Sequence, residues 1–139
     1  MKLRLLLVTL SLGALSLAHA ATKGNQPAHI AQGAAITLAD HLVAGKTTVV
    51  DFTSEYCPPC RAYAEPLNQL HAQRADVAVV KVDINRPDVR GIDWKSPVAQ
   101  QFGLRSIPHF KVYGPDGKLV AEGDDARKVV NDMLAKLNR

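Results

Sequence analysis

The chain has 139 residues, of which 47% are hydrophobic and 22% charged, and its formal net charge is +4. This length accommodates a single domain, and the apolar fraction excludes a wholly disordered chain. Lys and Arg are scattered along the sequence without a long run of like charges, so the basic balance indicates solubility rather than nucleic-acid binding.

Residues 1–20 have the pattern of a secretory signal peptide. Lys2 and Arg4 form a positive start, residues 5–17 are mainly apolar, and residues 18–20 (AHA) place small side chains where a signal peptidase cleaves. Because the apolar run is too short to span a bilayer comfortably, we expect a cleaved signal rather than an uncleaved anchor. The protein is therefore expected in the periplasm or outside the cell.

The segment that follows is interpreted as a flexible lead-in, because residues 21–33 are small and polar without periodicity. A single domain is then expected over residues 34–139. Residues 34–38 are predicted to form a short strand, and residues 40–43 a turn or short helix. The sequence TTVVDFT at 47–53 is β-branched and almost continuously apolar, which predicts a strand buried on both faces, as in a parallel sheet.

The rest of the chain is predicted to contain a helix that follows the cysteines to about Arg74, a strand at 77–84, a short helix at 96–102, a hairpin of strands at 109–113 and 118–122, and a helix at 124–137. The hairpin prediction rests on the turn sequence GPDG between its strands. Asp124 or Asp125 could cap the last helix. This order predicts an α/β fold in which a mixed central sheet is flanked by helices on both faces.

The two cysteines of the chain, Cys57 and Cys60, lie where a buried strand passes into a helix. A cysteine at a helix N-terminus faces unpaired backbone N–H groups and the positive end of the helix dipole, which favour the thiolate and lower the thiol pKa. Cys57 is therefore expected to be a nucleophile. Cys60, one helical turn later, is close enough to resolve a mixed disulfide.

A structural disulfide, a haem site and a zinc site are the other interpretations of this pair. A disulfide that closes so short a loop constrains the unfolded chain little, so it would stabilise the fold only weakly. A c-type haem site needs His directly after the second cysteine, where Arg61 stands. A zinc site needs two further ligands, and the candidates are dispersed: His29, His41, His71 and His109. We therefore expect no metal, and no cofactor other than the Cys57–Cys60 disulfide.

Three segments resemble thioredoxin-like proteins. The sequence VDFTSEYCPPCR at 50–61 is similar to their active-site segment, and SIPHF at 106–110 to their second landmark, a proline with a cis peptide bond that packs against the dithiol. The sequence VKVDI at 80–84 resembles their middle strand, which carries a lysine near the site. The resemblance extends from about Ile36 to the C-terminus, and its motifs follow the family's order and spacing. It implies a thioredoxin-like fold and thiol–disulfide oxidoreductase activity.

The resemblance also implies roles for single residues. Asp51 matches the family's buried carboxylate, whose pKa burial would raise, so that it could exchange a proton with Cys60 during resolution. Lys81 would lie near Asp51 and adjust the pKa of this carboxyl. The alternative is a solvated lysine at the end of a strand. Pro108 would hold the backbone of Ile107 open for an incoming extended peptide. Substrate contacts are expected from the residues that flank these groups: Tyr56, Pro58, Pro59, Ile107 and Pro108.

The chain departs from the thioredoxin pattern near the cysteines. Tyr56 stands where thioredoxins usually carry Trp, and Thr53 replaces another usual Trp. The loop at 85–95 is longer than its counterpart in thioredoxins and contains the only tryptophan, Trp94, which either docks substrate or covers the core. These differences leave the identity of the substrate open.

The dipeptide between the cysteines bears on the direction of electron flow. Pro58 and Pro59 have no backbone N–H, so two potential donors to a Cys57 thiolate are absent. We expect the pKa of Cys57 to be lowered less than in strongly oxidising relatives that have a donor there, which gives a more reducing couple.

The sequence therefore predicts an exported, monomeric reductase of protein disulfides, which acts through a Cys57 mixed disulfide resolved by Cys60. Because the compartment is oxidising, a membrane-bound donor would have to return the electrons. The alternatives are a disulfide-forming oxidant of the same fold and a non-catalytic peptide-binding module with a structural disulfide.

Overall fold

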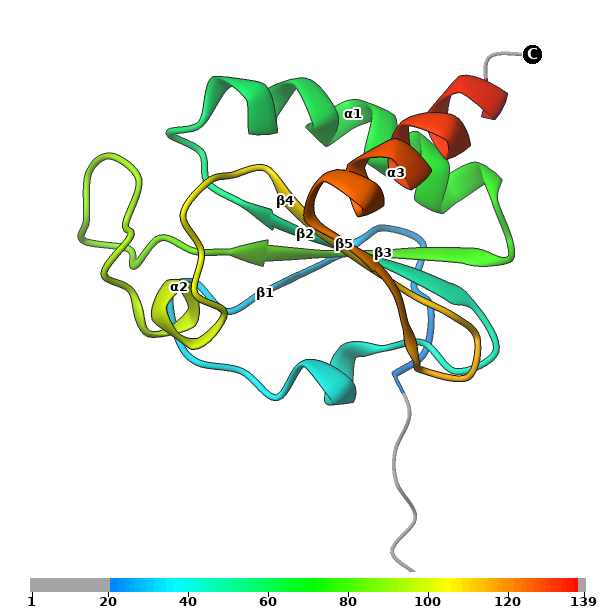
Figure 1. The fold of residues 1–139 in the computed structure, drawn as a ribbon, viewed down its shortest axis with the longest axis horizontal. Coiled ribbons are helices and arrows are strands. Elements are labelled where there is room, and N and C mark those ends of the chain that lie inside the picture. Colours follow the sequence, from blue (N-terminus) through cyan, green and yellow to red (C-terminus); the bar gives the residue numbers. More distant parts are fainter. Residues whose placement is uncertain (1–20, 138–139) are drawn as a thin grey trace, which may run out of the picture.

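The structure is a computed structural model that describes residues 21–137, so the signal peptide expected at residues 1–20 lies outside it (Figure 1). A five-stranded sheet crosses the molecule in the order β1-β3-β2-β4-β5. Its strands are β1 (Ala28–Ile30), β2 (Thr47–Thr53), β3 (Val77–Asp83), β4 (His109–Tyr113) and β5 (Leu119–Glu122). β1 and β2 pair in parallel with β3, whereas β4 pairs antiparallel with β2 and β5, so the sheet is mixed.

Helices cover both faces of this sheet, as Figure 1 shows. One face carries α1 (Pro58–Gln73) and α3 (Gly123–Leu137), and the other carries α2 (Pro97–Gln101) and a 3-10 helix, η1 (Leu38–His41). α1 and α2 both begin with proline, and Ser96 caps α2 by accepting a hydrogen bond from the Ala99 N–H at 3.2 Å. The predicted α/β fold is confirmed.

Two apolar layers form because each strand alternates its side chains between the faces of the sheet. Val50 and Phe52 of β2 pack toward α2, in a cluster that includes Val98. Val49 of β2 and Phe110 of β4 pack on the opposite face, against the apolar stripes of α1 and α3. β2 and β3 are thus buried on both sides, which explains their nearly continuous apolar sequences.

The N-terminal part of the chain differs from what the sequence predicted. Residues 28–30, within the segment interpreted as a flexible lead-in, form β1 and pair with residues 80–82 of β3. The strand predicted at 34–38 is wrong, because this segment is a loop that leads into η1. β1 forms because the open edge of β3 needs hydrogen-bond partners, and backbone groups supply them whatever the side chains are.

A close approach of two segments fixes the chain after β1. Gly33 has a φ of +82°, and a Cβ atom at this position would lie 2.7 Å from the backbone nitrogen of Arg86. The Gly33 N–H donates to the Asp83 carbonyl at 3.0 Å, and its own carbonyl accepts from the Val98 N–H at 3.1 Å. Glycine therefore joins this segment to both β3 and α2 at a distance that a side chain would prevent.

The C-terminal end of α1 is held by two lysines from outside the helix. Lys23 Nζ donates to the carbonyl of Arg74 at 2.7 Å, and Lys46 Nζ donates to the carbonyl of Ala75 at 2.6 Å. Ammonium groups at this position complement the negative end of the helix dipole and hold the chain that leaves the helix.

His71, buried on α1, extends the sheet edge beside β3. Its Nδ1 accepts a hydrogen bond from the Val79 N–H at 2.9 Å, so its Nε2–H donates to the Gly24 carbonyl, also at 2.9 Å. Val79 directly precedes the residues that pair with β1. The imidazole thus takes the place of a neighbouring strand and connects the N-terminal segment to the core.

The start of α3 differs in detail from the prediction. α3 begins at Gly123, directly after β5, so Asp124 and Asp125 lie within its first turn rather than at the cap. They form ion pairs one turn later, with Arg127 and Lys128 respectively.

Candidate active site

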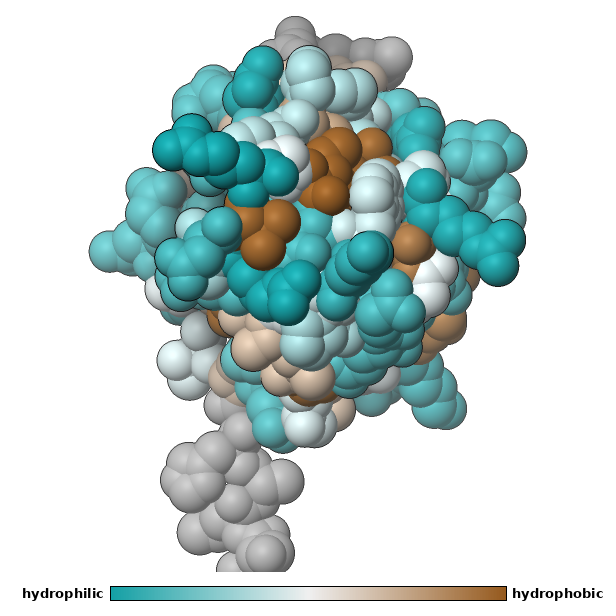
Figure 2. All heavy atoms as spheres, turned by 90° about the vertical axis from the view of Figure 1, so that its left-hand side faces the viewer, coloured by the Kyte–Doolittle hydropathy of each residue, from teal (hydrophilic) through white to brown (hydrophobic). Residues whose placement is uncertain are grey.

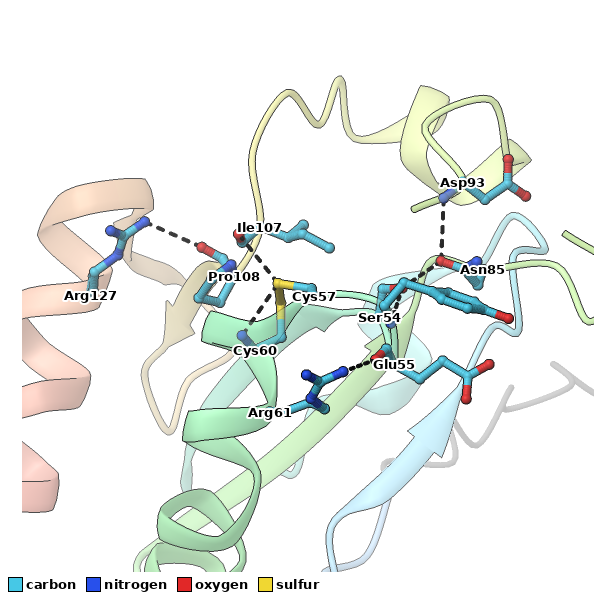
Figure 3. Close-up of a disulfide and its surroundings, with 11 residues drawn as sticks. Ser54, Glu55, Cys57, Cys60, Arg61, Asn85, Asp93, Ile107, Pro108 and Arg127 are labelled. Atoms are coloured by element: carbon cyan, nitrogen blue, oxygen red, sulfur yellow. Dashed lines mark hydrogen bonds between the residues drawn. A yellow bond between two sulfur atoms is a disulfide. The ribbon is translucent and has the colours of Figure 1, made fainter. Parts of the chain in front are cut away.

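Cys57 and Cys60 form a disulfide at the start of α1 (Figure 3). Their Cα atoms are 5.2 Å apart, and both residues are almost fully buried, at 2% and 1% exposure. Cys57 is the N-cap residue of α1, and Pro58 and Pro59 occupy its first helical positions. The end of β2 thus delivers two sulfur atoms to a helix N-terminus, as the sequence predicted.

Few backbone donors reach these sulfur atoms. The Cys60 N–H donates to Cys57 Sγ at 3.2 Å, and the Arg61 N–H donates to the Cys57 carbonyl at 3.1 Å. Because Pro58 and Pro59 carry no N–H, the Cys60 amide is the donor of this first turn that can stabilise a Cys57 thiolate after reduction.

The segment before β4 lies against the disulfide. The Ile107–Pro108 peptide bond is cis, and the carbonyl oxygen of Ile107 lies 3.6 Å from Cys57 Sγ, where it can accept a hydrogen bond from the reduced thiol. Arg127 of α3 donates from Nη2 to the Pro108 carbonyl at 3.3 Å (Figure 3). The segment before β4 therefore lies between two elements that are far apart in the sequence, because Ile107 contacts Cys57 at the start of α1 and Pro108 contacts Arg127 of α3.

A buried carboxyl and a buried ammonium lie beneath the disulfide. Asp51 of β2 is opposite Lys81 of β3, and burial raises the pKa of Asp51 to about 7 although the Lys81 charge opposes this. Lys81 donates to the Ala64 carbonyl at 3.1 Å and to Asn68 Oδ1 at 2.6 Å, and burial lowers its pKa. A carboxyl whose pKa is close to neutral can both accept and donate a proton at Cys60.

A cavity of about 210 Å³ lies behind Cys60. Cys60, Asp51 and Lys81 line its buried part. Exposed side chains line its outer part: His29, Glu55 and Arg61. The cavity gives the carboxyl and the sulfur of Cys60 a common space that water can enter.

A network of hydrogen bonds ties the turn before Cys57 to the loop at 85–95 (Figure 3). Ser54 Oγ accepts from the Tyr56 N–H at 3.2 Å and donates to Asn85 Oδ1 at 2.6 Å. Asn85 Nδ2 in turn donates to two carbonyls within the loop, at 2.6 and 3.2 Å. The shape of the loop and the shape of the turn are therefore coupled through one buried side chain.

The same loop is closed by an ion pair. Arg86 Nε and Nη2 donate to the two carboxylate oxygens of Asp93 at 2.7 and 3.0 Å, which lowers the pKa of Asp93. Trp94 follows directly and is 36% exposed, comparable to Tyr56 at 37%. Both aromatic side chains are thus partly available to a partner.

Within residues 21–137, no three His, Cys, Asp or Glu side chains gather where they could hold a metal ion. No helix in this part of the chain is long and apolar enough to cross a membrane.

The chain is similar to known proteins over most of its length, and the family model described as Thioredoxin matches residues 36–137. The chain belongs to the thioredoxin family. Thioredoxin F1, chloroplastic, of Arabidopsis thaliana is 33% identical over 92 residues, which are 66% of this chain and 46% of that protein. Thioredoxin H-type of Brassica oleracea is 32% identical over 91 residues, which are 66% of this chain and 68% of that protein.

Solved thioredoxin structures share the fold. Thioredoxin F from spinach chloroplast (long form) gives a TM-score of 0.55 at 21% identity and covers 92% of this chain and 98% of that one. A chain of the complex of ferredoxin:thioredoxin reductase with thioredoxin f2 gives a TM-score of 0.54 at 21% identity, covering 84% and 96%. The chain spans less than half the length of the first curated relatives that it matches, 46% and 44%.

Most of the residues expected to form the thioredoxin-like site do come together. Asp51 and Cys60 line one cavity, Lys81 lies in register with Asp51, and Ile107 lies against Cys57. The sequence reasoning missed three polar residues that hold this arrangement by hydrogen bonds, Asn68, Asn85 and Arg127. Of these, the position of Asn68 could have been found, because it follows Cys60 by two helical turns and shares its face of α1.

Proposed function

We propose that this thioredoxin-family protein is a thiol–disulfide oxidoreductase that reduces disulfides in other proteins. The observation that carries the proposal is the Cys57–Cys60 disulfide at the start of α1 with the buried Asp51 facing the same cavity as Cys60. A purely structural bridge would need neither a carboxyl with a pKa near 7 nor a cavity beside it.

The reaction starts from the reduced protein. The Cys57 thiolate attacks a substrate disulfide, forms a bond from Sγ to one substrate sulfur, and releases the other as a thiolate that takes a proton from solvent. The Cys60 thiol then gives its proton to the Asp51 carboxylate, and its sulfur attacks Cys57 Sγ. The bond to the substrate breaks, a second substrate thiolate leaves, and two electrons have passed from the cysteine pair to the substrate.

An extended protein segment is the substrate that the surface fits. Tyr56, Pro58 and Pro59 are exposed beside the sulfur atoms, and the Ile107 carbonyl lies next to Cys57. Figure 2 shows that this end of the molecule is mostly hydrophilic, with separate small apolar areas. Such a surface favours brief contacts with varied partners over one large apolar interface.

Export and a membrane-bound electron donor complete the proposal. The pattern of residues 1–20 supports a periplasmic or secreted protein, and an oxidising compartment makes a dedicated reductant necessary. The complex of ferredoxin:thioredoxin reductase with thioredoxin f2 is an example of a reductase that binds a protein of this fold. We expect this chain to act as a monomer and to receive electrons through its Cys57–Cys60 pair.

The Cys60→Ser variant tests the proposal directly. Without the resolving sulfur, the Cys57 mixed disulfide should accumulate as a covalent complex that a reductant releases, whereas the matched Cys57→Ser variant should trap nothing. If both variants keep the function of the wild type, the protein is a binding module and the proposal fails.

Equilibration of the Cys57–Cys60 couple with glutathione tests the direction of electron flow. A couple more reducing than the glutathione pair supports the reductase. A couple more oxidising than the glutathione pair contradicts it and indicates a disulfide-forming oxidant.

A further inference from the structure

β1 brings a histidine into the same row of the sheet as the buried carboxyl. His29 of β1 pairs with Lys81 of β3, and Lys81 pairs with Asp51 of β2. Residues paired in parallel strands point to the same face, and neighbouring strands are about 4.8 Å apart, so the backbones of His29 and Asp51 lie roughly 10 Å apart. His29 is exposed, whereas Asp51 is only 1% exposed.

The cavity behind Cys60 connects these two residues. His29 and Asp51 both line it, and its volume of about 210 Å³ is enough for several water molecules. Asp51 Oδ1 is buried and has no hydrogen-bond partner among the described residues. A water molecule in the cavity would therefore find an acceptor at its inner end and an imidazole at its outer end.

The proposed reaction needs an exit for one proton in each turnover. Asp51 can take this proton from Cys60 only while its carboxyl is ionised. Because the pKa of Asp51 is about 7, part of the reduced protein starts with this carboxyl protonated, and that proton must leave before Cys60 can transfer its own. Lys81 is a poor carrier because its ammonium group already carries its full set of protons and donates to Ala64 and Asn68.

We propose that His29 is the proton-exit residue of this site, which receives the proton of Asp51 through water in the cavity and releases it to solvent. The inference rests on the proposed function, because it completes the step in which Cys60 closes the disulfide. The O–H bond of the carboxyl breaks and an N–H bond of the imidazole forms. The imidazolium then gives a proton to bulk water, and no electrons move in this step.

The charges around His29 suit this role. Burial and the Lys81 charge lower the pKa of His29, and Asp83 opposes them. The imidazole is therefore mainly neutral near pH 7, so a ring nitrogen is free to accept a proton, and the lowered pKa favours release of that proton to bulk water. The other ionisable groups that face the cavity or Lys81 come from β3, the turn before α1, and α1: Asp83, Glu55, Arg61 and Glu65.

The test follows disulfide closure in a single turnover. Reduced protein is mixed with a small aromatic disulfide in dilute buffer between about pH 6 and 8. The first aromatic thiolate released reports attack by Cys57, and the second reports closure by Cys60. We expect His29→Gln to slow the second phase roughly 10-fold, less than the 10²–10⁴-fold typical of a group that acts directly on the reacting atoms.

Added imidazole separates proton transfer from a structural effect. It should restore the rate of the second phase in His29→Gln, because a free base can reach the exposed mouth of the cavity. It should not restore this rate in Asp51→Asn. His41→Gln removes a histidine that does not line this cavity and should leave both phases unchanged.

Two results would overturn the role of His29 while leaving the proposed function intact. One is a second phase in His29→Gln that equals that of the wild type. The other is a slowed phase that imidazole does not restore. A wild-type protein that releases no thiolate at all would instead refute the proposed function, and the role of His29 with it.

Discussion

Asp51 and Lys81 lie opposite each other in the register of β2 and β3, yet the Lys81 ammonium donates to Ala64 and Asn68 rather than to the carboxyl. The charge of Lys81 attracts the carboxylate, but burial has the larger effect, and the pKa of Asp51 rises to about 7. The folded protein therefore holds an ionised Asp51 at a cost in free energy.

We predict that stability falls as the pH rises through the titration of Asp51. The unfolded carboxyl loses its proton near the ordinary pKa of 3.8, whereas the folded one keeps it up to about 7. Between these values the folded state binds the additional proton, so the free energy of unfolding decreases with pH, by at most about 4 kcal/mol. Urea unfolding measured across this range checks the prediction.

Two variants isolate the contribution of this carboxyl. Asp51→Asn should remove the decrease and exceed the wild type in stability above about pH 7. Asp132→Asn, exposed on α3, should retain the decrease. Parallel curves for the wild type and Asp51→Asn would contradict the prediction.

We predict that Pro59→Ala makes the cysteine couple more oxidising. The new N–H at the second helical position is placed to donate to a Cys57 thiolate, beside the donor already supplied by Cys60. One such bond should lower the pKa of Cys57 by about 1 unit and raise the reduction potential by about 30 mV. Thiol titration and equilibration with glutathione measure the two changes.

Pro66→Ala is the matched control for this change. It introduces a backbone N–H within the same helix, but this N–H cannot donate to a sulfur atom. The reduction potential should therefore stay at the wild-type value. A Pro59→Ala protein with an unchanged reduction potential would show that the missing donor does not determine the potential of the Cys57–Cys60 couple.

We predict that Gly33→Ala destabilises the fold more than Gly45→Ala. Both glycines have positive φ, but a Cβ atom at Gly33 meets the backbone of Arg86, whereas nothing lies within 4 Å at Gly45. Gly45→Ala should therefore cost about 1 kcal/mol for backbone strain alone, and Gly33→Ala roughly 3 kcal/mol. Urea unfolding of the two variants measures the difference, and equal costs would count against the close approach.

The centre of the site could be predicted from the sequence because its signals are local. Cys57 and Cys60 share one helical turn after an apolar strand, and that arrangement alone places both sulfur atoms at a helix N-terminus. The place of Pro108 beside them needed the resemblance to thioredoxins, because 48 residues separate it from Cys60 and no periodicity connects them.

Other parts depend on contacts that local sequence does not encode. β1 is three residues long, with the sequence AHI, and exists because β3 offers it an unpaired edge. Ile36 and Leu38 suggested a strand, but they pack on the apolar cluster around Phe52 from a loop and the start of η1. The sequence showed only that the loop containing Asn85 is longer than in thioredoxins. The role of Asn85 comes from its hydrogen bond to Ser54 in the turn before Cys57, which is a contact between distant parts of the sequence.

The two lysines at the far end of α1 limit what can change when the disulfide opens. Lys23 and Lys46 hold the chain just beyond this helix, and Leu67 and Leu70 of the helix are fully buried in the core, so we expect the helix to stay in place while the sulfur atoms separate. We expect the oxidised and reduced forms to superimpose everywhere except in the first helical turn and the side chains around it. A partner that binds one form in preference to the other must therefore contact the protein within a few ångströms of Cys57, because more distant surfaces are the same in both forms.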